Sequence, residues 1–146
     1  MSAPHAPQFR QRAVEKAGLA DRYLDLLGPW KSMLDLGLTT WAEKPEPTRS
    51  DSHAWSAHPT VDLLRLVAGV EPATPGFETV RIRPHLGSLT TLSATVPTPK
   101  GDIVVAYKKD AAGLTADVML PPGVSGTIEL SGQQSSLHAG KNSVNK

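Results

Sequence analysis

The stretch of sequence that decides the fold is IVVAYKKDAAGLTADVML, residues 103–120. Large apolar residues recur at every second position in its two halves: Ile103, Val105 and Tyr107 alternate with Val104, Ala106 and Lys108, and Leu114, Ala116, Val118 and Leu120 alternate with Thr115, Asp117 and Met119. The residues between them, Asp110 to Gly113, favour a turn. A period of two on both sides of a turn is typical of a hairpin that buries one face. We therefore expect two paired strands here.

The same alternation recurs on both sides of this hairpin. Val80 and Ile82 alternate with arginines, and Ile128 and Leu130 flank a glutamate. Further turn-forming residues lie at 99–101, 121–123, 131–132 and 139–140. Several short strands separated by such turns predict an antiparallel β-sandwich over residues 71–146.

The preceding residues follow a helical period instead. Apolar side chains lie three or four apart over residues 23–34, and Gly28-Pro29 within that run predicts a kink or a junction between two helices. A further helix, beginning near His53 or Ala57, should end at Gly69. Its expected buried side chains are Val61, Leu64, Val67 and Ala68, with Leu63 and Leu66 widening the buried face.

Three other segments complete an α+β chain in two parts. Residues 1–8 are rich in Ala, Pro and His, and we expect them to be disordered. Residues 38–52 have no helical period and predict an ordered loop, while EPATPG at 71–76 has the composition of a linker. The helices over residues 9–70 are few and strongly apolar on one face, so they need packing partners.

The overall composition excludes several classes of function. A net charge of +1 gives no electrostatic reason to expect nucleic acid or an anionic membrane as a partner. The absence of cysteine excludes disulfides and thiolate metal sites, and no His pattern predicts a metal or a cofactor. The chain also lacks an apolar run long enough for a membrane span and a recognisable secretory signal, which leaves its localisation unknown.

Candidate functional residues cluster before residue 60. Trp30, Trp41 and Trp55 fall in one short stretch with Glu43 and His53. Aromatic rings together with carboxylates and hydrogen-bond donors are the usual components of a sugar site. Taken singly, however, Glu43 would most often be a solvated loop residue, and His53 and His58 would usually be helix-end or surface histidines.

Two long runs of sequence resemble a known family. Residues 30–59, WKSMLDLGLTTWAEKPEPTRSDSHAWSAHP, resemble the end of the catalytic barrel of glycoside hydrolase family 78, the bacterial α-L-rhamnosidases. Residues 70–89, VEPATPGFETVRIRPHLGSL, and 95–103, TVPTPKGDI, resemble the start of its C-terminal β-sandwich. The resemblance implies that residues 9–70 are the last helices of an (α/α)6 barrel and that residues 71–146 are the sandwich.

The resemblance also implies roles for individual residues. The family removes terminal α-L-rhamnose from glycosides with inversion, and its general base corresponds to Glu43 in the Thr-Thr-Trp-Ala-Glu motif. His53 matches a histidine that contacts the sugar, and Trp41 and Trp55 are expected to line the pocket. The family's general acid lies far upstream. The remainder of the barrel should therefore be missing or on another chain, and we expect this chain to be inactive alone.

Two other classes of function stay open at this stage. The sandwich or the tryptophan-rich loop could form a non-catalytic carbohydrate-binding or accessory module, which would still bind sugar after removal of residues 1–70. The apolar helix faces could instead drive self-association of a structural remnant, which light scattering would detect.

Overall fold

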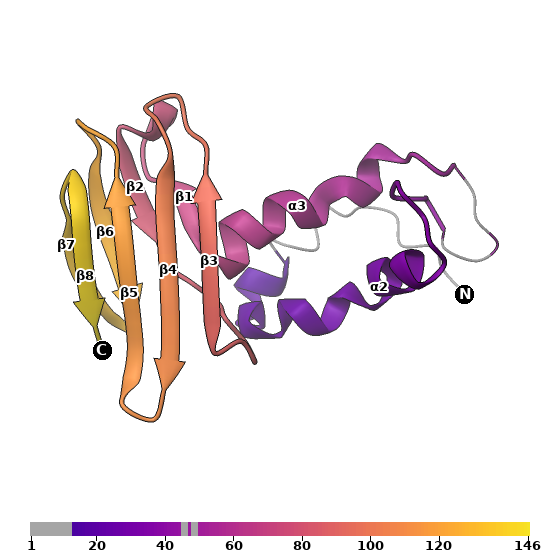
Figure 1. Cartoon of the computed structure of the whole chain (residues 1–146), viewed down its shortest axis with the longest axis horizontal. Helices are drawn as coiled ribbons and strands as arrows, with labels where there is room; N and C mark the ends of the chain where they lie inside the picture. The colour runs from indigo at the N-terminus through magenta and orange to yellow at the C-terminus, as the bar shows by residue number, and fades with distance from the viewer. Residues whose placement is uncertain (1–12, 45–46, 48–49) are drawn as a thin grey trace. The chain divides into compact units, whose positions relative to one another are not determined.

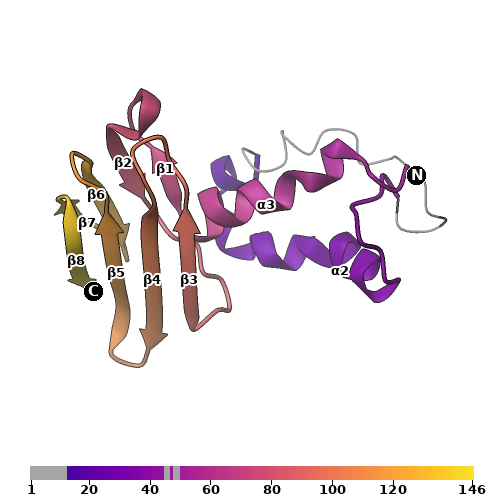
Figure 2. The ribbon, with the colours of Figure 1, turned by 45° about the horizontal axis from the view of Figure 1, so that its top comes forward.

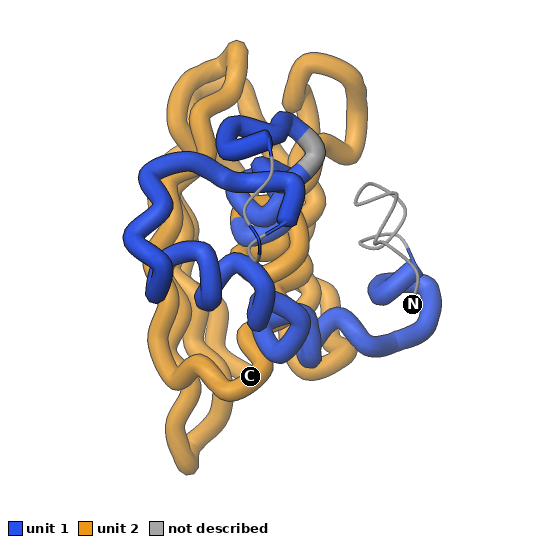
Figure 3. Tube along the Cα trace, turned by 90° about the vertical axis from the view of Figure 1, so that its right-hand side faces the viewer, with its two compact units in different colours: residues 1–63 blue, residues 64–146 orange. Residues whose placement is uncertain are grey.

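The computed structural model describes residues 13–44, 47 and 50–146. The chain forms two compact units, Met1–Leu63 and Leu64–Lys146, which Figure 3 shows in different colours. The expected disordered start at residues 1–8 and the beginning of the first helix at Phe9 lie outside the described residues.

The first unit consists of short helices joined by a long loop. Its elements are helical backbone at residues 13–16, the 3-10 helix η1 (Ala20–Leu27), α2 (Gly28–Asp35), the 3-10 helix η2 (Ala54–Ala57) and α3 (His58–Asp62). The junction predicted at Gly28-Pro29 is confirmed, because η1 ends at Leu27 and α2 begins at Gly28. Pro29 lies in the first turn of α2, where its missing N–H breaks no hydrogen bond.

The helix after the loop buries a different face from the predicted one. It passes from 3-10 geometry in η2 through α3 to the π-helix η3 (Leu63–Val67). Leu66, Val67 and Ala68 are buried as expected and Leu64 is partly buried, but Val61 is 52% exposed and Leu63 is 39% exposed. The predictions for Val61 and Leu63 were wrong because the number of residues per turn changes along this run, which rotates the buried face away from a uniform helical stripe.

The second unit is a sandwich of two four-stranded sheets, which lie in separate layers (Figure 1 and Figure 2). One sheet has the strand order β1 (Val70–Pro72), β2 (Thr79–Ile82), β6 (Ser125–Leu130) and β7 (Gln133–Leu137). The other has the order β3 (Thr91–Val96), β4 (Ile103–Asp110), β5 (Gly113–Leu120) and β8 (Gly140–Asn145). The predicted sandwich is thus present, and its central strands are those that the alternation indicated.

One strand pair departs from the expected antiparallel arrangement. β2 and β6 run parallel, with Val80 opposite Gly126 and Ile82 opposite Ile128, whereas the other pairs of the described sheets are antiparallel. The chain builds β3, β4 and β5 in the other sheet before it returns to pair β6 with β2. Alternation within a strand does not reveal the direction of such a distant partner.

The core lies between the two sheets. Ile103, Val105 and Tyr107 of β4 point into it, as do Val118 and Leu120 of β5. The Tyr107 hydroxyl donates a hydrogen bond to the backbone oxygen of Ala68 (2.7 Å), which satisfies its polar atom inside the core. Burial raises the pKa of Tyr107 well above its ordinary value.

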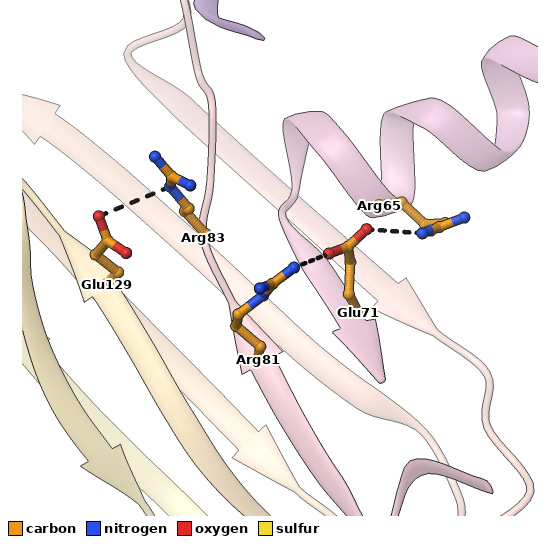
Figure 4. A network of polar contacts seen from close by, with 5 residues as sticks. All are labelled: Arg65, Glu71, Arg81, Arg83 and Glu129. Atoms are coloured by element: carbon orange, nitrogen blue, oxygen red, sulfur yellow. Dashed lines mark hydrogen bonds and ion pairs between the residues drawn. The ribbon is translucent and has the colours of Figure 1, made fainter. Parts of the chain in front are cut away.

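The segment expected to be a linker is instead part of the sandwich. Glu71 lies in β1, opposite Arg81 of β2, and its carboxylate accepts hydrogen bonds from Arg81 (2.7 Å) and Arg65 of η3 (2.8 Å), as Figure 4 shows. Burial by itself would raise the pKa of Glu71, but the hydrogen bonds from the two guanidinium groups outweigh it and hold the pKa below its ordinary value. This clamp fixes the end of the helix to the first two strands.

Candidate functional site

The loop after α2 folds back on itself, and its two limbs are held together by backbone hydrogen bonds. The Glu43 amide donates to the oxygen of Ser50 (3.3 Å), and the His53 amide donates to the oxygen of Trp41 (2.7 Å). The Thr40 hydroxyl also donates to the backbone oxygen of Asp51. Glu43 and His53 therefore lie on facing limbs of one loop, although nine residues of sequence separate them.

The burial along this loop suits a binding surface. Ala42 is completely buried, and its neighbours Trp41 and Glu43 are partly buried. His53 is also partly buried. The buried Ala42 anchors the first limb, so the adjacent indole and carboxylate are held at the surface without being enclosed. Trp55 falls in η2, and its side chain lies outside what the structure describes.

Beneath the second limb, Trp30 contacts the turn that follows His53. Its indole N–H donates to the backbone oxygen of Ser56 (2.7 Å). Its ring meets the His58 ring edge to face, with centroids 4.9 Å apart and an interplanar angle of 85°. Trp30 is therefore a structural support for η2, which agrees with its predicted place on the helical stripe.

A buried carboxylate completes this support. Asp62 is 3% exposed, and its Oδ2 accepts a hydrogen bond from the Tyr23 hydroxyl (2.8 Å). The same oxygen lies 2.6 Å from Nδ1 of His58, so Nδ1 must carry the proton of that hydrogen bond. Burial, the hydrogen bond to Asp62 and the charge of Asp62 all raise the pKa of Tyr23.

Sequence reasoning missed this network. His58 was expected to be a surface or helix-end histidine, and neither Tyr23 nor Asp62 was singled out. The available signal was the spacing of four between His58 and Asp62, which places both side chains on one face of a helix. The contribution of Tyr23, 39 residues away from Asp62, follows only from the tertiary structure.

Across the described ranges 13–44, 47 and 50–146, no group of three or more His, Asp or Glu side chains could hold a metal ion. Within the same ranges, no helix is both long enough and apolar enough to cross a membrane.

Comparisons with known proteins identify relatives of both units. The family model described as bacterial alpha-L-rhamnosidase C-terminal domain matches residues 69–145. A curated α-L-rhamnosidase of Alteromonas sp. (strain LOR) is 28% identical over 131 residues, which cover 77% of this chain and 14% of that protein. This chain thus spans about a seventh of the length of that relative.

Solved structures show the same fold over most of the chain. The native α-L-rhamnosidase from Aspergillus terreus matches with a TM-score of 0.80 at 20% identity, covering 91% of this chain and 18% of that one. The family GH78 rhamnosidase of Bacillus sp. GL1 matches with a TM-score of 0.75 at 29% identity, covering 86% of this chain and 15% of that one. Because the sandwich unit is little more than half of the chain, these matches extend into the helices of the first unit.

Proposed function

Because this chain belongs to the family of bacterial α-L-rhamnosidase C-terminal domains, we propose that it is the C-terminal part of an inverting α-L-rhamnosidase. In this proposal Glu43 is the general base and residues 71–146 form the accessory sandwich. The observation that carries it is the folded loop that brings Glu43 and His53 onto facing limbs, in a chain whose relatives are α-L-rhamnosidases.

The helices of the first unit are the end of an (α/α)6 barrel in this proposal. Most of the exposed large apolar side chains of the described residues belong to this unit. They are Leu19, Leu26, Leu34, Leu36, Val61 and Leu63. Apolar side chains at this density on a short helical unit mark a surface that packs against other protein. The remaining helices of the barrel, on a longer chain or a second one, are the partner that the short coverage of the relatives suggests.

Glu43 suits the part of a general base. Inversion needs two carboxyl groups on opposite sides of the glycosidic bond, roughly 6.5–9.5 Å apart, so that a water molecule fits beside one of them. A partly buried carboxylate on a loop braced across both limbs can hold that water in a fixed place. His53 on the opposite limb and Trp41 beside Glu43 supply the hydrogen-bonding group and the apolar surface that a sugar ring requires.

The general acid is expected from the upstream part of the barrel. Loss of an acid that protonates the leaving oxygen costs roughly 10²–10⁴-fold in rate. Loss of the groups that hold the sugar adds a further penalty through lost positioning. The isolated chain should therefore show little or no release of rhamnose.

A carbohydrate-binding role for the sandwich alone is less well supported. The aromatic residues of the second unit are Phe77 and Tyr107. Tyr107 is 3% exposed with its hydroxyl bonded to Ala68, and Phe77 packs against the core. A sugar-stacking platform needs an aromatic face open to solvent. The described sandwich offers none.

The experiment that tests the proposal is a chimera in which this chain replaces the matching stretch of the Bacillus sp. GL1 enzyme. We expect the chimera to release nitrophenol from an aryl α-L-rhamnoside, and Glu43→Gln to reduce the rate by about 10²–10⁴-fold. The matched control, Glu78→Gln, changes an exposed glutamate of the second unit and should leave the rate unchanged. The chain alone should release nothing.

Two outcomes would contradict the proposal. A folded chimera whose rate is the same in Glu43→Gln and Glu78→Gln would remove Glu43 from the chemistry. Proton NMR of the first product formed should show β-L-rhamnose, and the α anomer would rule out inversion. Light scattering of the isolated chain addresses the other use of its apolar helices, since a stable dimer would favour self-association over a missing barrel.

A further inference from the structure

We propose that Tyr23, Trp30, His58 and Asp62, here called the anchor cluster, are positioning residues that hold the loop bearing Glu43 and His53 in its working conformation. This inference rests on the proposed function for the meaning of that loop, but the contacts that carry it are independent of any enzymatic activity. No member of the anchor cluster is proposed to touch the sugar.

The buried carboxylate of Asp62 is costly to leave without partners. The Asp62 side chain is 4% exposed, and an ionised carboxylate in such a place is strongly unfavourable unless hydrogen bonds or charges compensate it. Tyr23 and His58 both bond to its Oδ2. Removing either Tyr23 or His58 would leave the buried Asp62 carboxylate with one hydrogen bond fewer. The three side chains therefore stabilise one arrangement together.

The anchor cluster draws its members from three helices. Tyr23 belongs to η1, Trp30 to α2, and His58 and Asp62 to α3. The cluster therefore joins the helices before the loop to the helix after it. Because the described residues between Asp35 and Ala54 form no helix and no multi-residue strand, these cross-links fix where the two ends of the loop start and finish.

Hydrogen bonds form a continuous path from the anchor cluster to the loop. Trp30 donates to the oxygen of Ser56, and the Ser56 amide donates to the oxygen of His53 (2.9 Å). The His53 amide in turn donates to Trp41, two residues before Glu43. These hydrogen bonds link the partly buried Trp30 indole, step by step, to the limb that carries the proposed base.

The burial of His58 and Asp62 indicates a positioning role and not a catalytic one. Asp62 is too deeply buried to meet a substrate, and the His58 side chain is 15% exposed with Nδ1 engaged by Asp62. Nε2 of His58 is buried and has no hydrogen-bond partner among the described residues. The His58 ring therefore contacts both Trp30 and Asp62. Its effect on the site passes through the backbone hydrogen bonds that join Trp30 to the loop.

The test compares paired variants of the full chain by amide hydrogen exchange. His58→Ala removes the donor to Asp62, whereas His58→Asn retains a donor close to the position of Nδ1. Trp30→Phe retains an aromatic ring but loses the hydrogen bond to Ser56. The amides of Glu43 and His53 report the loop, because each is hydrogen-bonded across it, and the amides of Val105 and Val118 report the sandwich.

We expect exchange at Glu43 and His53 to become about tenfold faster in His58→Ala and Trp30→Phe, as is typical for loss of one hydrogen bond. His58→Asn should restore most of the protection, and the sandwich amides should not change. Unaltered loop amides, equal acceleration throughout the helical unit, or no rescue by Asn would each overturn the proposal.

The activity of the chimera then separates this inference from the proposed function. If Glu43→Gln has no effect there while the loop amides respond as expected, the function fails and the positioning network stands. If Glu43 is essential, Trp30→Phe should lower kcat more than it changes KM, because a displaced base impairs the chemical step more than sugar binding. An unchanged kcat in Trp30→Phe would overturn the positioning role.

Discussion

The residue at the junction of helix and sandwich should tolerate no side chain. Gly69 follows η3 and precedes β1, with φ +75°, and its oxygen accepts the Arg83 amide at 2.9 Å. A Cβ added there would lie 2.2 Å from the carbonyl carbon and oxygen of Arg83 and 2.4 Å from the nitrogen of Pro84. All three atoms belong to the backbone, so the clash cannot be relieved by rotation of a side chain.

The expected cost of Gly69→Ala has two parts. A left-handed backbone conformation costs an alanine about 1 kcal/mol relative to glycine. Forcing a methyl group into filled space costs a further 1–3 kcal/mol, roughly, and more where the backbone itself must move. Gly123→Ala is a matched control, because Gly123 has φ +78° but a Cβ there would meet nothing within 4 Å. It should therefore show the first cost without the second.

Urea unfolding measures both variants. The three tryptophans lie before residue 64, so tryptophan fluorescence follows the helices of the first unit. Far-UV circular dichroism follows mainly the sandwich, because the strands of both sheets lie in the second unit. We expect Gly123→Ala to lose about 1 kcal/mol of unfolding free energy and Gly69→Ala to lose about 2–4 kcal/mol. Equal losses in the two variants would refute the close approach of Gly69 to Arg83.

Three further predictions concern polar groups. Glu71→Gln should destabilise the sandwich above about pH 5 and have progressively less effect as the pH falls below about 4, because a lowered carboxyl pKa contributes stability that is lost on acidification. Urea midpoints measured against pH test this expectation. A difference between variant and parent that does not change with pH would contradict it. Tyr23 and Tyr107 are the only tyrosines of the chain, and both have raised pKa values, so their stability contribution is lost as pH rises past about 10. Absorbance at alkaline pH should then show phenolate appearing only together with unfolding, and ionisation of a folded chain near pH 10 would refute their burial. Asn142→Ala removes a buried side-chain amide that donates to the backbone oxygens of His138 (2.8 Å) and Gly140 (3.0 Å). It should lower the unfolding free energy, measured by thermal or urea unfolding, by about 1–3 kcal/mol. The control Asn145→Ala changes an exposed asparagine and should be nearly neutral.

The difference between predicted and unpredicted strands has one physical origin. The alternation of side chains identified β2, β4, β5 and β6, which occupy the centres of their sheets. The strands that it missed, β1, β3, β7 and β8, are the edges. Edge strands bury less and hold polar residues such as those of QQSSL in β7, and one of them accommodates Pro72, which central strands exclude.

The candidate site divides in a similar way. The sequence identified Trp41, Glu43 and His53 through their resemblance to a family, and the structure places all three on one folded loop. Their catalytic and binding roles stay predictions. The whole anchor cluster could not be derived from the sequence, because the spacing of His58 and Asp62 indicates only a shared helix face and not the contact with the distant Tyr23.

The sequence by itself determined the change from helices to strands, the central strands of the sandwich and the junction at Gly28, because these depend on side-chain periods and backbone preferences within a few residues. Tertiary structure alone decided the parallel pairing of β2 with β6 and the burial of Asp62 between Tyr23 and His58. These features depend on the free energy of contacts between distant segments. No local pattern encodes that free energy, so only the folded chain reveals them.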